Sequence, residues 1–413
     1  MLAAATLAWT LVLAVLLRHR VFASHDAINN YAHVWYVAGG LWHHHRLPLR
    51  MPVLGHGGAY TYPYAFVAWT SAAVLWPVFG DWTVTLWLAL GFLGVVGAMF
   101  WALPEFRRHP WLAAAALVNP ALVQAPFLGQ LPFLWATAFL FLAIGAWRRE
   151  RRPAAAVFAA LAQSGHPAVV LPITAGVVLG RLLWEPRRRA LLGWWAVSLV
   201  PTIPAAWVVL VSPVYQDSSS GVRWTEFLRT LEVRLLVVLV PVILVAVARN
   251  GWRWAGPPAF AAILACNPFF ASMLHGPPVW QALFRPSDRL VLGFTRSPDF
   301  VPGATYRLLQ AGGERLGMYQ LLRAGGRLDS EFFPESMLWK NFPGTGAYSA
   351  LLASRRVDFV LDCTDFDRVF ATNEHALLEE LASSPAPAAG VRTRLVTRTP
   401  WYSLYAVRRP APG

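Results

Sequence analysis

The sequence predicts a polytopic α-helical membrane protein that carries a small α/β domain at its C-terminal end. Three observations support this fold class: 56% of the 413 residues are hydrophobic, the mean hydropathy is +0.45, and only 14% of the residues are charged. Soluble domains contain about 25% charged residues, so most of this chain is suited to lipid. A change of composition divides the chain into a transmembrane domain, residues 1–275, and a second domain, residues 276–413.

The basic charge of the chain does not require a nucleic-acid partner. The formal net charge of +14 comes from arginines that gather in short loops between apolar runs, and Lys340 is the only lysine. Such clusters mark the cytoplasmic ends of transmembrane helices, so we expect membrane lipids around this chain and no nucleic acid. The two cysteines, Cys266 and Cys363, indicate neither a disulfide framework nor a metal site.

The apolar runs predict a multi-pass protein of the cell membrane. A straight helix needs about 20 residues to cross a bilayer, and tilted or broken helices differ from this length. The first run has no cleavage pattern and is expected to be retained. Arginine clusters at both ends of 154–184 predict two short helices that bend at His166. The runs cover residues 2–17, 65–80, 82–103, 129–147, 154–184, 190–211, 231–248 and 255–275.

Two topologies are open for the first quarter of the chain. Pro120 and Pro126 interrupt the stretch 109–130, which we interpret as re-entrant rather than as a crossing. About nine crossings, with the N-terminus inside, then place the loop 18–64 and the C-terminal domain outside the cytoplasm. The alternative has about ten crossings and a cytoplasmic loop, which the arginines of that loop favour.

Residues 276–413 predict a soluble extracytoplasmic α/β domain. This region gathers prolines, glycines and most of the acids, and none of its apolar runs is long enough to span a membrane. Alternating or β-branched stretches predict strands, and helical stretches lie between them. The predicted strands are 305–310, 357–362, 393–398 and 401–409, and the predicted helices are 346–356 and 373–382.

Asp26 is the candidate catalytic residue. It lies in the stretch SHDAINNYAHVWY, just after the first apolar run, where an acid close to lipid is retained more readily when it has a function. A carboxylate in this position can accept the proton of an acceptor hydroxyl group. His25 and His33 are candidates to orient it or to bind a phosphate. The alternative is an aromatic interfacial belt with an incidental acid.

Gln130 and His166 are further candidates because both stand at helix ends. Gln130 opens a predicted helix, where unpaired backbone N–H groups favour polar ligands. His166 stands at a helix break, where it contacts either a substrate or the protein itself as a cap. The histidines at 43–45 do not predict a metal site, because three successive helical residues point in three directions.

These motifs resemble those of the GT-C superfamily of polytopic membrane glycosyltransferases. The shared pattern is an apolar helix followed by SHD, then His33, then LPLRMPVLGHGGAYTYPY at 47–64, with GHP at a helix break. This pattern is similar to that of a bacterial membrane family labelled 6-pyruvoyl-tetrahydropterin-synthase-related. GQ at 129–130 is similar to polyprenol-phosphomannose-dependent mannosyltransferases, which carry a lysine–proline pair where this chain has Gly165, His166 and Pro167.

The resemblance implies transfer of a sugar, with mannose as one candidate, from a polyprenyl-phosphate donor to a cell-envelope glycan or lipid acceptor. The resemblance implies a reaction that inverts the anomeric configuration, with Asp26 as the general base. It implies no cofactor, although a divalent cation is optional, and no pterin chemistry. The implied substrate contacts are His25, His33, Arg50, Tyr62, Gln130 and His166. A transporter or flippase of lipid-linked precursors and a non-catalytic membrane scaffold are the alternatives. A transporter predicts ionisable residues at mid-membrane and two related halves, and the sequence shows neither.

Overall fold

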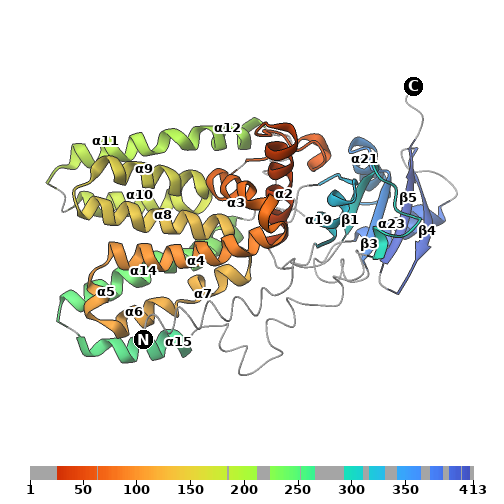
Figure 1. Cartoon of the computed structure of the whole chain (residues 1–413). Coiled ribbons are helices and arrows are strands. Elements are labelled where there is room, and N and C mark those ends of the chain that lie inside the picture. Colours follow the sequence, from red (N-terminus) through yellow and green to blue (C-terminus); the bar gives the residue numbers. More distant parts are fainter. Residues whose placement is uncertain are drawn as a thin grey trace.

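The structure, a computed structural model, describes residues 26–62, 64–183, 186–211, 224–251, 253–265, 293–309, 316–330, 342–363, 373–384, 390–400 and 402–409. His25 and the predicted helix at 2–17 lie outside these ranges. The described residues form a bundle of helices that run side by side, with an α/β domain at one end of the bundle (Figure 1). This is the fold class that the sequence predicts.

Apolar helices build the bundle, and proline stands in the first turn of α8, α9 and α10, where its missing N–H costs nothing. Within the described ranges, three stretches are long and apolar enough to cross a membrane: Trp82–Ala102, Leu131–Arg148 and Arg188–Val208. The bundle helices are α4 (Trp82–Ala102), α8 (Leu131–Arg148), α9 (Arg152–Gly165), α10 (Pro167–Leu182), α11 (Arg188–Leu199), α12 (Ile203–Val211), α14 (Trp224–Arg249) and α15 (Gly256–Ala265).

The segment between α4 and α8 traverses the whole bundle. Gly91 of α4 lies against Leu134 of α8, and Gly145 of α8 lies against Trp101 of α4, so the two helices run in the same direction. The chain must therefore return between them, which it does in α5 (Glu105–Arg108), α6 (Pro110–Leu117) and α7 (Pro120–Phe127). The predicted break in 109–130 is present, but the re-entrant interpretation is wrong.

Asn119 makes this break possible inside the bundle. Its side-chain oxygen accepts a hydrogen bond from the N–H of Ala121 at 3.0 Å and so caps α7. Its amide group donates to the carbonyl of Leu236 in α14 at 2.6 Å. A helix break leaves backbone N–H and C=O groups without helical hydrogen bonds, and these groups need partners within the protein. Asn119 provides such partners and at the same time joins α7 to α14.

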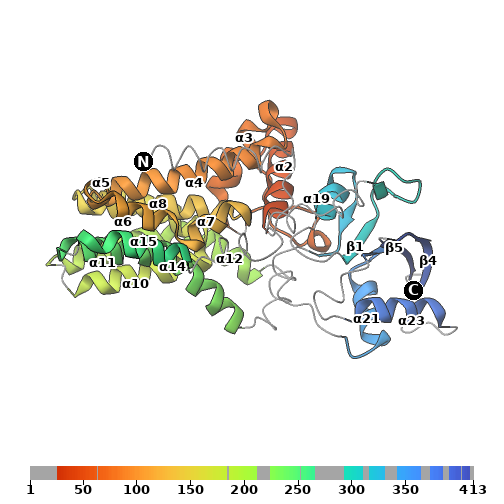
Figure 2. The same cartoon turned by 90° about the horizontal axis from the view of Figure 1, so that it is seen from below.

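The predicted crossing at 65–80 is wrong. It forms α3 (Phe66–Phe79), and the contacts at its two ends show why. Ala65, just before it, donates its N–H to the carbonyl of Gly165 at the end of α9, at 3.1 Å. Asp81, just after it, is bonded to the α/β domain. Both ends of α3 thus lie at one end of the bundle, beside α2 (Ala27–His44), which lies across that end (Figure 2).

Arginines gather at the opposite end of the bundle. Glu105 of α5 holds this end together, because Arg148 of α8 and Arg249 of α14 both donate hydrogen bonds to its carboxylate. Partial burial alone would raise the pKa of Glu105, but these two guanidinium groups lower it to about 2. The arginines at this end are Arg107, Arg108, Arg148, Arg149, Arg151, Arg152, Arg181, Arg187, Arg188, Arg189 and Arg249.

The α/β domain contains a five-stranded sheet in the order β2-β1-β3-β5-β4. β2, β1 and β3 are parallel, whereas β5 is antiparallel to both β3 and β4. The strands are β1 (Thr305–Leu309), β2 (Arg327–Leu328), β3 (Phe359–Cys363), β4 (Arg392–Arg398) and β5 (Tyr402–Arg408). The helices are α19 (Leu316–Arg323), α21 (Thr345–Ser354) and α23 (Glu374–Ser383). The four predicted strands and two predicted helices are confirmed, whereas β2 and α19 were not predicted.

Buried contacts join the α/β domain to the bundle. Tyr319 of α19 donates a hydrogen bond to Asp81 at 2.5 Å, and Arg323 donates to the same carboxylate at 2.9 Å. The Tyr319 ring also packs against Tyr31 and Trp35 of α2, with centroids 5.6 and 6.4 Å apart. Asp81 is only 3% exposed and Tyr319 only 1%, so the hydrogen bond between them is shielded from solvent. The domain therefore rests directly on α2.

Arg307 of β1 is a buried charge that joins three segments of the α/β domain. Its guanidinium donates to Asp329, after β2, at 2.7 Å and to both carboxylate oxygens of Glu374 in α23, at 2.7 and 2.8 Å. All three side chains are at most 6% exposed. Burial alone would lower the pKa of Arg307, but the two carboxylates hold it well above its ordinary value.

Arg307→Ala should destabilise the α/β domain by roughly 3–5 kcal/mol, because the carboxylate of Glu374 stays buried without this counter-ion and Asp329 keeps only a longer contact with Arg355, at 3.7 Å. Arg409→Ala is the control: it breaks a pair with Asp358 whose side chains are 31% and 34% exposed, and it should cost less than about 1 kcal/mol. Denaturant-dependent proteolysis of the full-length protein in detergent measures both free energies of unfolding. Equal losses in the two variants would contradict the buried role.

Candidate active site

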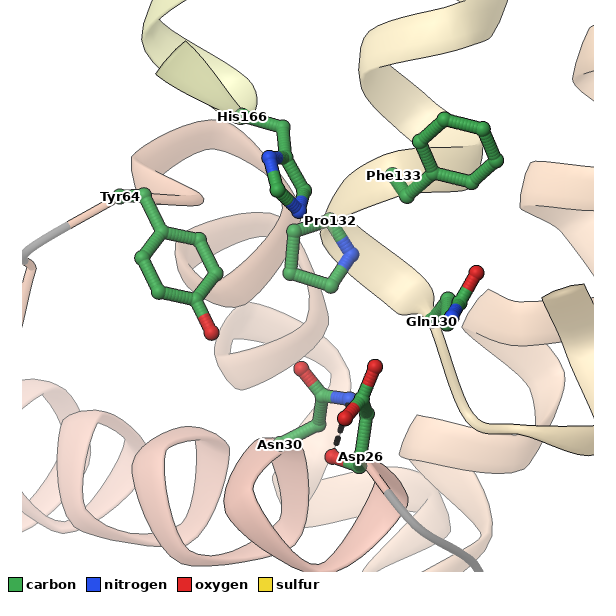
Figure 3. A pocket seen from close by; sticks show the side chains of 7 residues that line it. All are labelled: Asp26, Asn30, Tyr64, Gln130, Pro132, Phe133 and His166. Carbon is green, nitrogen blue, oxygen red and sulfur yellow. Dashed lines mark hydrogen bonds between the residues drawn. The ribbon is translucent and has the colours of Figure 1, made fainter. Parts of the chain in front are cut away.

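A pocket lies at the end of the bundle that faces the α/β domain, where α2, the start of α8 and the break between α9 and α10 meet (Figure 3). It unites three of the predicted site residues, Asp26, Gln130 and His166, which come from separate parts of the sequence. The full lining consists of Asp26, Asn30, Tyr64, Gln130, Pro132, Phe133 and His166. Within the described chain, Asp26 is the only acid in this lining.

Asp26 immediately precedes α2. It occupies the N-cap position with φ −101° and ψ −14°, but its carboxylate makes no capping hydrogen bond to the helix. The carboxylate instead lines the pocket (Figure 3). The backbone of Asp26 is held by its N–H, which donates to the carbonyl of Leu128 at 2.9 Å. A carboxylate that borders a pocket is in a position to take part in proton transfer there.

Gly129 allows the loop before α8 to touch the first turn of α2. Its φ is +68°, and a Cβ atom there would lie 2.4 Å from the backbone nitrogen of Ala27. Only glycine tolerates both the positive φ and this approach. Gln130 follows at the N-cap of α8 and makes no side-chain capping bond. In the GQ pair, Gly129 therefore makes the close backbone contact with α2, and Gln130 next to it provides a side chain that lines the pocket.

His166 lies at the predicted break between α9 and α10. Its carbonyl accepts the N–H groups of Val169 and Val170, at 3.2 and 2.9 Å, and so begins α10. The residue is 9% exposed, and its imidazole lies between two aromatic rings, with centroids 5.5 Å from Tyr64 and 6.2 Å from Phe133. The backbone of His166 thus acts as a cap while its ring borders the pocket (Figure 3).

The structure does not bring His33, Arg50 or Tyr62 to this pocket. His33 is fully buried, with Nδ1 2.9 Å from the carbonyl of Thr61 and its ring stacked on Trp69 at 4.1 Å. It follows Asp26 by about two helical turns, or roughly 10 Å along the helix, and it is not part of the pocket lining.

Arg50 and Tyr62 belong to the loop that follows α2. Arg50 is exposed and donates a hydrogen bond to the hydroxyl of Tyr60 at 3.0 Å. Burial raises the pKa of Tyr62 to about 12, and its hydroxyl is 3.0 Å from that of Thr70. These contacts are to protein groups and give neither residue a place at the pocket. The predicted role of His25 falls outside the described residues.

Four residues of the pocket were not predicted as site residues: Asn30, Tyr64, Pro132 and Phe133. Asn30 follows Asp26 by four residues, and this helical spacing places both on one face of α2. Tyr64 belongs to the same aromatic stretch as Tyr62, and Pro132 and Phe133 follow Gln130 by two and three residues. Helical periodicity could have identified Asn30, whereas the choice of Tyr64 over Tyr62 depends on how the loop folds.

The described residues contain no group of three histidines, cysteines or acids that is arranged to hold a metal ion. The histidines at 43–45 are exposed at the end of α2. The optional divalent cation implied by the resemblance therefore remains an open expectation. The polar groups of the pocket are suited to binding oxygen-rich ligands by hydrogen bonds.

No protein-family model and no curated protein sequence matches the chain. Among solved structures, it is similar to ArnT from Cupriavidus metallidurans, whose crystal structure contains bound undecaprenyl phosphate. The two share 14% sequence identity with a TM-score of 0.50, over 98% of this chain and 97% of the other. Such low identity establishes the fold alone, which is a helical bundle with a C-terminal α/β domain. The family resemblances stay predictions.

Gly129→Ala should displace the first turn of α2 and lower the free energy of unfolding by at least about 1–2 kcal/mol, the cost of positive φ alone. Gly176→Ala in α10 is the control, because a Cβ atom there meets nothing within 4 Å. That change should be neutral or stabilising by up to about 1 kcal/mol. Denaturation in detergent micelles measures both. A Gly129→Ala protein as stable as the wild type would show that the close approach is not required.

Proposed function

We propose that this chain is a membrane glycosyltransferase that moves a sugar from a polyprenyl-phosphate donor to a hydroxyl group of a cell-envelope glycan or lipid. The observation that carries the proposal is the convergence of Asp26, Gln130 and His166 in one pocket of a GT-C-like bundle. The fold it shares with ArnT, solved with undecaprenyl phosphate, supports a polyprenyl phosphate as carrier. Mannose is the candidate sugar.

The proposed step is an inverting displacement at the anomeric carbon. The acceptor oxygen attacks C1 of the sugar and forms the new glycosidic bond. The bond between C1 and the phosphate oxygen breaks, and its electron pair leaves with the polyprenyl phosphate. Asp26 accepts the proton of the acceptor hydroxyl. Gln130 and His166 donate hydrogen bonds to the phosphate oxygens, where negative charge develops.

The walls of the pocket suit a lipid-borne sugar. Tyr64, Pro132 and Phe133 provide apolar and aromatic surface next to the polar groups. A polyprenyl-phosphate sugar likewise joins an apolar chain to a charged and hydroxylated head. A pocket at a bundle end, where lipid headgroups meet water, presents both kinds of surface to such a molecule.

We further propose that the pocket and the α/β domain face away from the cytoplasm. The arginines occupy the other end of the bundle, which the distribution of charge in membrane proteins assigns to the cytoplasm. The segment 109–130 traverses the bundle and 65–80 does not. One crossing is gained and one is lost, so the nine-crossing topology keeps the same number of crossings and the same sides for its loops. The ten-crossing topology needs both as crossings, which does not fit the position of 65–80, although the arginines of the loop 18–64 favour it.

The transporter alternative has no observation in its favour. The charged groups described here lie near the ends of the bundle, for example Asp81 at one end and Glu105 at the other. Ion-coupled transporters place such groups near mid-membrane. The scaffold alternative predicts that substitution of Asp26 has no effect, whereas the enzyme predicts a loss of transfer.

Asp26→Asn should reduce transfer by about a hundredfold or more, because a carboxamide cannot accept the proton. The assay follows labelled mannose from undecaprenyl-phosphate mannose into glycan and lipid fractions, in membranes that contain the full-length protein. Glu150→Gln, an exposed acid at the arginine end, is the control and should keep wild-type transfer. Undiminished transfer by an Asp26→Asn protein would exclude the general-base role.

The orientation can be tested with single cysteines in a Cys266→Ala, Cys363→Ala background. A membrane-impermeant maleimide should label His44→Cys, at the exposed C-terminal end of α2, in intact cells or spheroplasts. Arg108→Cys, at the arginine end, should be labelled only after the membrane is permeabilised. The reverse pattern would place Asp26 on the cytoplasmic side and reject the proposed orientation.

A further inference from the structure

We propose that Asn30 is a positioning residue that holds Asp26 in the geometry needed for proton transfer; this inference rests on the proposed function. Asn30 lies one turn after Asp26 in α2, is only 2% exposed, and borders the same pocket (Figure 3). Its role is distinct from that of Asp26, because its amide bonds to protein groups and is not needed to accept a proton.

The amide of Asn30 joins three segments of the chain. Its NH₂ group donates to the carbonyl of Asp26 at 3.0 Å and to the carbonyl of Gly129 at 2.7 Å. Its oxygen accepts the indole N–H of Trp69 in α3, at 2.8 Å. Both amide hydrogens and the amide oxygen are thus used. The Asn30 amide therefore ties the backbone that carries Asp26 to α3 and to the loop that carries Gln130.

This arrangement fixes two pocket residues relative to each other. The bond to Asp26 holds the residue at the start of α2, where a helix otherwise frays. The bond to Gly129 holds the residue next to Gln130. Loss of the amide leaves the Trp69 N–H and the Gly129 carbonyl buried without this partner, and both are expected to move toward other partners or water. A shift of about 1 Å at a catalytic group costs about a hundredfold in rate.

Asn29 provides a matched control. It has the same side chain, adjoins Asn30 and is similarly buried, at 4% exposed. Its NH₂ group lies 3.5 Å from the hydroxyl of Tyr64, at the limit of a hydrogen bond, and it makes no bond to Asp26 or Gly129 among the contacts described. Substituting Asn29 by alanine removes the same atoms from the same helix without releasing Asp26.

The experiment compares Asn30→Ala, Asn29→Ala, Asp26→Asn and the double variant Asp26→Asn/Asn30→Ala as full-length proteins in membranes. Transfer from labelled undecaprenyl-phosphate mannose gives kcat and KM, and unfolding in detergent reports folding. Asn30→Ala should lower kcat at least tenfold while KM changes less than threefold. Asn29→Ala should lower kcat less than threefold. Trp69→Phe, which removes only one donor to Asn30, should give an intermediate loss.

The double variant separates positioning from structure. If Asn30 acts through Asp26, the double variant should be no slower than Asp26→Asn alone, because there is no base left to position. Multiplied losses in the double variant, or a wild-type kcat in Asn30→Ala beside an inactive Asp26→Asn, would overturn the inference and leave the proposed function intact. A fully active Asp26→Asn protein would instead exclude the general-base role of Asp26, and a wild-type protein that transfers no sugar would overturn the proposed function itself.

Discussion

The contact between the first turn of α2 and the loop before α8 fixes the geometry of the pocket. The two backbones approach so closely at Gly129 that no side chain fits between them. The N–H of Asp26 bonds to Leu128, and the amide of Asn30 bonds to Gly129 across the same junction. Asp26 and Gln130 become neighbours because of this crossing. The third pocket residue, His166, is brought to the same place by the turn between two antiparallel helices.

Acids anchor both ends of the bundle. One end holds an arginine cluster and the carboxylate of Glu105, which binds arginines from α8 and α14. The other end holds Asp81, which binds α19 of the α/β domain. In each case one acid at a helix junction fixes an element that is distant in sequence. The two ends of the bundle are therefore tied by the same kind of contact but face different surroundings.

Much of this architecture could be predicted from local sequence. The break at His166 follows from arginines at both ends of 154–184, and the strands β1, β3, β4 and β5 follow from alternating residues. The predictions that failed have one cause: the contact that determines the local structure is made with a residue far away in the sequence. The apolar stretch 65–80 has the composition of a crossing, yet Asp81 pairs with Tyr319, 238 residues later. Asp26, Gln130 and His166 could be selected as polar residues at helix ends. His33 and Asn30 are both buried polar residues of α2, and only the contacts around each side chain show that Asn30 borders the pocket and His33 does not.

The shortness of α9 and α10 affects the membrane as well as the protein. Their 14 and 16 residues extend about 21 and 24 Å, less than the roughly 30 Å of a hydrocarbon core. A bilayer responds to such hydrophobic mismatch by thinning around the short helices. Headgroups and water are then drawn inward along α9 and α10, toward the turn that contains His166. In the proposed function, a carrier lipid that diffuses in the leaflet would reach the pocket without lifting its chain out of the bilayer.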